Sequence, residues 1–164
     1  MRSSIGSVQM LRLAVILLGI SATALAADPE SSTVIGVNED LSAGARALQM
    51  KDYEEGVRLT IEGLKFESSR RNRVSGLSNL CAGYTALKKY ADAIESCDEA
   101  IEIDDKNWHA FNNRALAYLG KGNIEAAKRD LEAGLILNPD SRKLLEVAEM
   151  IELREKEPPV AIDD

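Results

Sequence analysis

Two consecutive stretches of the chain repeat each other without a gap. Residues 74–107 align with residues 108–141, so that Tyr84 falls over Tyr118 and Ala93 over Ala127, each pair 34 positions apart. A fixed period of this length is typical of solenoids, in which each repeat buries its apolar face only against its neighbours. The spacing therefore predicts a stack of repeats.

Apolar residues recur at helical spacing in both halves of each repeat. The first half of the second copy carries such a series at Leu77, Leu80, Cys81, Tyr84 and Leu87. Each half predicts an amphipathic helix, and each repeat an antiparallel helical hairpin. Gly56, Gly63 and Gly134 fall inside predicted helices, where glycine costs roughly 1 kcal/mol against alanine. We expect close contacts between helices at these glycines.

This pattern resembles the tetratricopeptide repeat, a helix–turn–helix with a large residue, Leu-Gly, Tyr, Ala, an aromatic residue and Pro at fixed offsets. The third copy fills these positions with Phe111, Arg114-Ala115, Tyr118, Ala127, Leu131 and Pro139. The second copy fills them with Leu77, Leu80-Cys81, Tyr84, Ala93, Cys97 and Asp105. The resemblance implies an all-α, helix-turn-helix repeat solenoid that winds as a right-handed superhelix.

A weaker first copy covers residues 37–70. It lies 37 positions before the second copy, which we interpret as a three-residue insertion, Arg71-Asn72-Arg73, in a solvated junction loop. A seventh helical pattern covers residues 142–157 and is expected to be the polar-faced cap that a repeat array needs. The predicted repeat domain thus spans residues 38–157, with repeats at 37–70, 74–107 and 108–141, and an acidic tail follows at 158–164.

The first 26 residues are predicted to be a secretory signal peptide. Residues 1–12 carry Arg2 and Arg12 and no acid, residues 13–25 form a short apolar run, and Ala24-Leu25-Ala26 is a cleavage motif. The alternative is an uncleaved anchor, but the run is shorter than the roughly 18 residues of a spanning helix. We expect export, to the periplasm of a bacterium or by secretion, with a polar linker at residues 27–37 and no membrane insertion after cleavage.

Composition excludes several classes of partner and of chemistry. Cleavage after residue 26 leaves 18 basic against 27 acidic residues, a net charge of −9, which argues against binding nucleic acid or anionic membranes. His109 is the single histidine, so a His-rich metal site cannot be assembled, and no triad or Cys-His pair can be built around a second histidine. The segment 120–123, Gly-Lys-Gly-Asn, lacks the spacing of a phosphate loop and predicts a turn. We expect no catalytic residue, no metal site and no cofactor.

Cys81 and Cys97 are expected on opposing helices of one repeat, at the same height and on the buried face. One interpretation is a pair of small core residues. A second is a disulfide, which suits a protein exported to an oxidising compartment. A third is a redox-active pair, although the C-x-x-C spacing of such pairs is absent.

The first helices of tetratricopeptide repeats line a concave groove that commonly holds an extended peptide or a partner's helix. By this resemblance the candidate partner-binding residues are Ser42, Asn79, His109, Asn112, Asn113 and Leu116. Asn79 and Asn113 are equivalent, and their amides suit reading a peptide backbone; the alternative is ordinary solvated side chains. Heat-shock co-chaperones of the family clamp a C-terminal carboxylate with Lys and Arg at groove positions. These positions hold Leu41, Ala45, His109 and Asn113 here, and only Asn79 matches, so that function is not transferred.

The sequence therefore predicts an exported, non-enzymatic adaptor or scaffold that binds a protein or peptide partner in its groove, in assembly of the cell envelope. One alternative is a structural subunit of a larger complex that docks through its convex face. Another is a thiol-redox factor that uses Cys81, Cys97 and His109. The oligomeric state is left open.

Overall fold

The computed structural model describes residues 38–156, which contain seven helices and no strand. The helices are α1 (Glu39–Gln49), α2 (Tyr53–Leu64), α3 (Arg70–Ala86), α4 (Tyr90–Ile103), α5 (Trp108–Gly120), α6 (Ile124–Leu137) and α7 (Arg142–Lys156). The predicted signal peptide, linker and acidic tail lie outside the described residues. None of the helices within residues 38–156 is long and apolar enough to cross a membrane.

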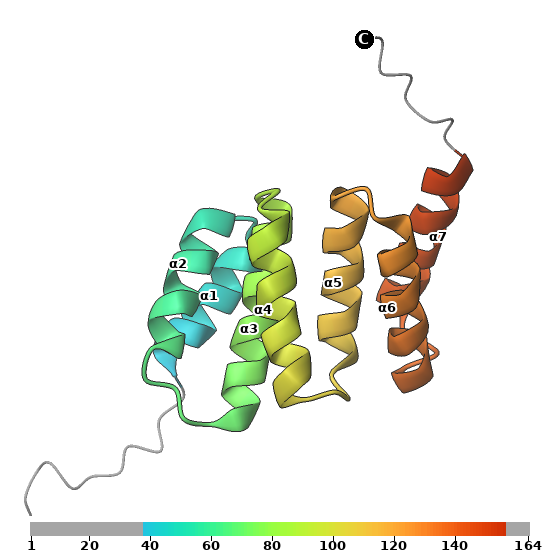
Figure 1. The fold of residues 1–164 in the computed structure, drawn as a ribbon. Helices are drawn as coiled ribbons and strands as arrows, with labels where there is room; N and C mark the ends of the chain where they lie inside the picture. Colours follow the sequence, from blue (N-terminus) through green and yellow to red (C-terminus); the bar gives the residue numbers. More distant parts are fainter. Residues whose placement is uncertain (1–37, 157–164) are drawn as a thin grey trace, which may run out of the picture. The chain divides into compact units, whose positions relative to one another are not determined.

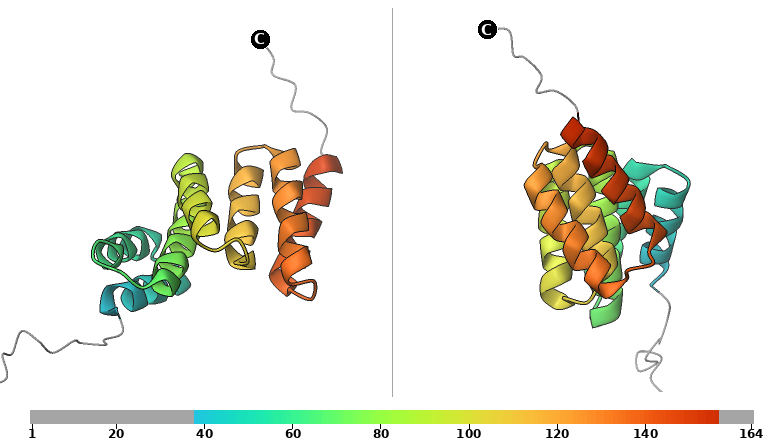
Figure 2. Two further views of the ribbon diagram at one scale, coloured as in Figure 1. Left: turned by 60° about the horizontal axis from the view of Figure 1, so that its bottom comes forward. Right: turned by 90° about the vertical axis from the view of Figure 1, so that its right-hand side faces the viewer.

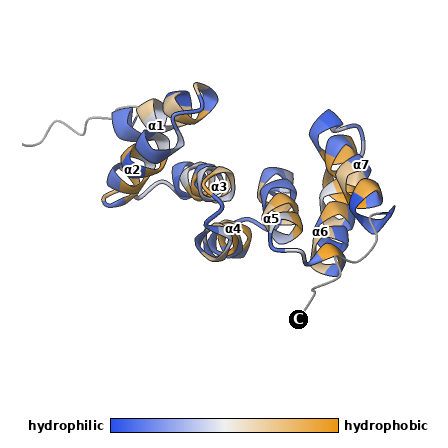
Figure 3. Ribbon diagram, turned by 90° about the horizontal axis from the view of Figure 1, so that it is seen from above, coloured by the Kyte–Doolittle hydropathy of each residue, from blue (hydrophilic) through white to orange (hydrophobic). Residues whose placement is uncertain are grey.

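The helices pair as antiparallel hairpins, α1 with α2, α3 with α4 and α5 with α6, and the hairpins stack side by side (Figure 1). At the end of the stack α7 packs against α5 and α6 (Figure 2, right). Viewed along the helices, α1, α3, α5 and α7 follow the inner side of a curve, and α2, α4 and α6 lie outside it (Figure 3). We call these sides the inner face and the outer face. The predicted fold class, an all-α repeat solenoid, is confirmed.

The turn inside each hairpin contains one residue with left-handed backbone. These residues are Lys51, Lys88 and Gly122, with φ of 64°, 60° and 82°. They lie 37 and 34 positions apart, so the turns repeat with the spacing found in the sequence. The predicted turn at residues 120–123 is confirmed, because α5 ends at Gly120 and the side chain of Asn123 accepts a hydrogen bond from the first turn of α6.

The predicted junction loop at residues 71–73 was wrong. These three residues belong to α3, which begins at Arg70 and is 17 residues long, against 13 for α5. The side chain of Ser69 caps α3 by accepting a hydrogen bond from the backbone N–H of Asn72, and none of the three inserted residues interrupts a helix. The insertion therefore adds about one turn to helix α3 and does not lengthen a loop.

Close helix contacts explain the glycines inside helices. A methyl group on Gly63 would lie 2.8 Å from the backbone nitrogen of Leu41, and one on Gly134 would lie 2.7 Å from a methyl of Leu144. Both distances are well below van der Waals contact, so only glycine allows these helices to pack as they do. The expected close contacts at these two positions are confirmed.

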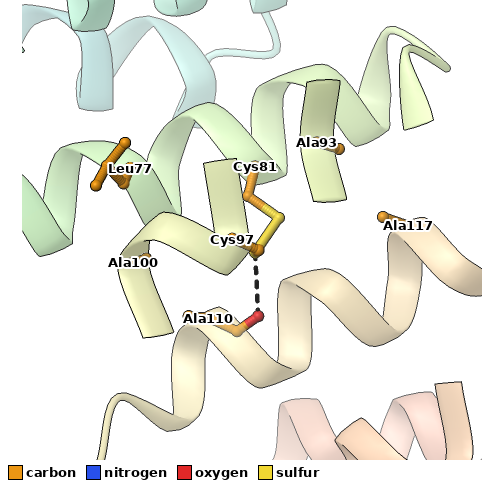
Figure 4. Packing of buried hydrophobic residues seen from close by; sticks show 7 residues of the cluster. All are labelled: Leu77, Cys81, Ala93, Cys97, Ala100, Ala110 and Ala117. Carbon is orange, nitrogen blue, oxygen red and sulfur yellow. Dashed lines mark hydrogen bonds between the residues drawn. A yellow bond between two sulfur atoms is a disulfide. The ribbon is translucent and has the colours of Figure 1, made fainter. Parts of the chain in front are cut away.

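The core between the second and third hairpins is built from small side chains (Figure 4). Ala93, Ala100, Ala110 and Ala117 are fully buried there, together with Cys81 and Cys97. A second buried cluster, which includes Val147 and Ile151 of α7, joins the last helix to α5 and α6.

Candidate functional site

One stripe of α3 is left uncovered by the helices around it. Its residues are Ser75, Asn79, Ala82 and Ala86, at positions i, i+4, i+7 and i+11, and all are exposed or half-buried. The other sides of α3 pack against α1, α2, α4 and α5. Positions with this spacing share one side of a helix, so the stripe opens onto the inner face.

The same stripe recurs on the helices beside α3. On α5 it holds His109, Asn113, Leu116 and Gly120, each 34 positions after its counterpart, and on α1 it includes Ser42, Ala45 and Gln49. Ser42, Asn79, His109 and Leu116, which the sequence assigned to the groove, therefore lie on the inner face with side chains that are exposed or half-buried.

Asn112 does not belong to this open stripe, contrary to the prediction. It lies at the edge of the stripe on α5, and only 4% of its surface is exposed. Its Nδ2 donates to Oδ1 of Asn113 at 3.2 Å, and its Oδ1 accepts no hydrogen bond from the described residues. Periodicity places Asn112 on the inner side of the helix, but the packing of its neighbours covers it.

Asn113 is half-buried and its amide is already used. Its Nδ2 donates to the backbone oxygen of Ser78 at 2.9 Å, and its Oδ1 accepts from Asn112. Asn107, the N-cap of α5, donates to Oγ of Ser78 at 2.9 Å. These bonds hold α5 against α3, so the predicted pairing of Asn79 with Asn113 as two readers of a ligand backbone does not hold. Asn79 alone keeps its amide free of hydrogen bonds to the described residues.

His109 stands at the start of α5 with its ring stacked on that of Trp108, and the ring centroids are 3.6 Å apart. Partial desolvation of the ring lowers the pKa of His109 below its ordinary value, and the positive charge of Lys143 lowers it further. The imidazole is therefore neutral at neutral pH, and it offers one donor and one acceptor to a ligand.

Leu116 borders an apolar hollow between α5 and α7. The hollow has a volume of about 310 Å³ and is lined by Leu116, Leu119, Gly120, Met150, Leu153 and Arg154. Met150 is 49% exposed and Leu153 64%. This end of the inner face can accept an apolar side chain.

Charge is distributed unevenly between the helices. The inner helices α3 and α5 contain no acidic residue, whereas the outer helix α4 contains five acids and no base. The centre of the inner face is therefore bordered by helices that carry only neutral and basic side chains, although the whole chain has a net charge of −7.

Cys81 of α3 and Cys97 of α4 are joined by a disulfide, with Sγ atoms 2.14 Å and Cα atoms 5.4 Å apart (Figure 4). Neither residue is exposed, and Sγ of Cys97 lies 3.1 Å from the backbone oxygen of Ala110. Thiol exchange requires access to a sulfur atom. The burial of both sulfurs therefore weighs against the redox interpretation.

An ion cluster, which the sequence pattern did not predict, joins the second and third hairpins. Arg114 of α5 binds Asp130 of α6 through two hydrogen bonds of 2.6 and 2.8 Å, and binds Asp98 of α4 at 2.5 Å. The hydrogen bonds to Asp130 raise the pKa of Arg114. The available signal was an arginine at a repeat position where the pattern expects leucine, together with an acid on each neighbouring helix.

The geometry defines a helical-repeat protein with an open inner face. The model of the tetratricopeptide repeat matches two segments of this chain, residues 84–107 and 109–141. The matched segments cover the end of α3, all of α4 and α6, and α5 except for its first residue, Trp108. No group of side chains within residues 38–156 could hold a metal ion.

The chain is similar to parts of larger proteins. It is 29% identical to the heat shock protein STI1 of Saccharomyces cerevisiae over 60% of this chain and 16% of that protein. It is 28% identical to human sperm-associated antigen 1 over 71% of this chain and 13% of that protein. The chain thus spans less than a fifth of these relatives.

A solved structure with the same fold is the second tetratricopeptide domain of human RPAP3 in complex with the HSP70 peptide SGPTIEEVD. It superposes with a TM-score of 0.61 at 23% identity, over 69% of this chain and 92% of that domain.

Proposed function

We propose that this protein is an exported, non-enzymatic adaptor that holds a segment of a partner protein on its inner face. We propose further that it acts in the assembly of the cell envelope. The observation that carries the proposal is the stripe of exposed and half-buried side chains repeated on α1, α3 and α5, which includes Ser42, Asn79, His109 and Leu116. Solenoids use such extended concave surfaces for binding. The relative of known structure binds a peptide.

Two observations support the proposed export. Residues 1–26 have the sequence pattern of a signal peptide, and Cys81 and Cys97 are held in disulfide geometry. Disulfides persist in the periplasm and outside the cell and are rare in the cytosol. Intact-mass measurement of protein from the native host tests this proposal: the mature chain should begin at Ala27, and a full-length product bound to the membrane would contradict it.

Site-specific photocrosslinking tests the proposed adaptor function. A photoreactive amino acid replaces Asn79 on the inner face or, as the matched control, Glu99, which is exposed on α4. In the native host, position 79 should give a discrete adduct with one partner protein, and position 99 should not. An adduct at position 99 alone would favour the structural-subunit alternative, in which the outer face docks.

A further inference from the structure

A polar hollow lies where α3 and α5 both begin. It has a volume of about 480 Å³ and is lined by Arg70, Arg71, Val74, Ser75, Asp104 and Asn107. The two helices start at the same end of the stack (Figure 1). The first backbone N–H groups of both helices lie at this end, where α4 also ends at its C-cap Asp104. Because the dipole of α4 opposes those of α3 and α5, the positive charge of the hollow comes from the two arginine side chains.

Arg70 and Arg71 differ in how they are held. Arg70 donates a hydrogen bond from Nη2 to the backbone oxygen of Ile103, at the end of α4, which fixes its guanidinium at this junction. Arg71 is exposed, and its guanidinium forms no ion pair or hydrogen bond with residues 38–156. In a chain with 27 acids and 20 bases, an arginine that lines a hollow and forms no ion pair is available for an anionic group, although Asp104 lines the same hollow.

The acids near the hollow already accept hydrogen bonds. Oδ1 of Asp104 accepts from the backbone N–H of Lys106 at 3.2 Å. Glu67, just before α3, accepts from the backbone N–H of Ser69 and from the side chains of Asn38 and Asn72, and these bonds lower its pKa. Neither carboxylate pairs with Arg71.

The hollow continues into the inner face. Ser75 lines the hollow and is also the first member of the open stripe of α3, one turn before Asn79. Four residues of helix span about 6 Å, which is the length of about two residues of an extended chain. A segment that contacts Asn79 can therefore place a neighbouring side chain in the hollow.

We propose that this hollow is an anchor site for a carboxylate, and that its occupant is an acidic side chain of the partner segment on the inner face. The proposal rests on the proposed adaptor function and adds the chemistry of the partner. It assigns Arg71 as the principal cation, Arg70 as supporting charge and Ser75 as a hydrogen-bond donor. The acid-free sequences of α3 and α5 favour the same ligand, because they bring no negative charge close to it.

Fluorescence anisotropy with a labelled hexaglutamate peptide tests the proposal, with hexaglutamine as the uncharged control. Wild-type protein should bind hexaglutamate at low ionic strength, and its affinity should fall as salt is added. R71Q should weaken binding about five-fold and R70Q/R71Q about ten-fold or more. Because Arg71 has no partner within the described residues, R71Q leaves the fold unchanged and remains informative if the double variant is unstable.

Two further variants sharpen the test. K88Q/K89Q makes the same change in charge as R70Q/R71Q at the opposite end of α3 and should alter binding less than two-fold. D104N keeps the side-chain oxygen that accepts the hydrogen bond from the backbone N–H of Lys106 but removes the negative charge at the hollow. It should strengthen binding of hexaglutamate about two-fold. Equal losses in R71Q and K88Q/K89Q, or no binding of hexaglutamate, would overturn the proposal.

The test of the anchor site and the test of the adaptor function can fail independently. An adduct at position 79 together with unchanged binding by R71Q would reject the anchor site and leave the adaptor function standing. Binding of hexaglutamate that depends on Arg71, without any adduct at position 79, would reject the adaptor function.

Discussion

The side-chain amide of Asn113 donates a hydrogen bond to the backbone oxygen of Ser78, 2.9 Å away, and so ties α5 to α3. Asn79, one repeat earlier at the equivalent position, has no such bond. Two residues that are equivalent in sequence therefore have different roles. Asn113 holds the stack together, and Asn79 remains available to a ligand.

This difference predicts opposite results for two alanine substitutions. Asn113→Ala removes a half-buried hydrogen bond between helices and should lower the free energy of unfolding by about 1–2 kcal/mol. Asn79→Ala should change it by less than about 0.5 kcal/mol. Urea unfolding of both variants measures the difference, and equal stabilities would contradict the assignment.

Reduction of the bond between Cys81 and Cys97 should destabilise the protein. The two residues are 16 positions apart, and closing a loop of that length stabilises by about 3 kcal/mol in the chain-entropy model. For a domain of this size the melting temperature should fall by roughly 10 °C in reductant. The variant C81A/C97A is the control and should not respond to reductant. Two free thiols in protein purified from its own compartment would instead support the interpretation as simple core residues.

The ion cluster predicts a strong effect at one acid and a weak effect at the other. The side chain of Asp130 is 7% exposed and that of Asp98 54%. Asp130→Ala leaves the largely buried guanidinium of Arg114 without the carboxylate that accepts two of its hydrogen bonds. It should lower the free energy of unfolding by about 2–4 kcal/mol. Asp98→Ala removes an exposed partner and should cost less than about 1 kcal/mol. Thermal unfolding of the two variants measures these losses of stability, and equal losses would contradict this account.

The left-handed turns predict a stabilising substitution. Lys88 has φ of 60°, a conformation that costs an L-residue about 1–2 kcal/mol. Lys88→Gly should stabilise the protein by about 0.5–1 kcal/mol, because the greater freedom of glycine in the unfolded chain offsets part of the relief. Gly122→Ala makes the reverse change in the next repeat and should destabilise. Chemical denaturation measures the free energy of unfolding of both variants. If neither substitution changes it, the backbone at this turn is not strained.

The repeat spacing was sufficient to predict the hairpins. The alignment of Tyr84 with Tyr118 fixed the register of the second and third copies, and amphipathic periodicity then predicted each helix and the turns between them. The junction at residues 71–73 was misassigned because an insertion in the alignment does not reveal whether the extra residues lengthen a helix or a loop. Arg-Asn-Arg continues the helix that Ser69 caps.

The candidate site was harder to predict than the fold. Periodicity identifies the side of a helix on which Asn112 and Asn113 lie, but not the width of the strip that neighbouring helices cover. The pairing of Asn113 with Ser78 depends on the distance between α3 and α5, which no local pattern encodes. Arg114 was missed for a related reason, since its two acids come from different helices and meet only when the hairpins stack.

A titration of the partner segment identified by crosslinking tests the central claim, that the inner face carries binding, most directly. Asn79→Ala should weaken binding about ten-fold, because a lost hydrogen bond of about 1 kcal/mol also strands the ligand group that Asn79 served. The control E95Q/E99Q neutralises two exposed acids of the outer helix α4 and should bind like wild type. Unchanged binding by Asn79→Ala together with failure of E95Q/E99Q would contradict the account and assign the interaction to the outer face.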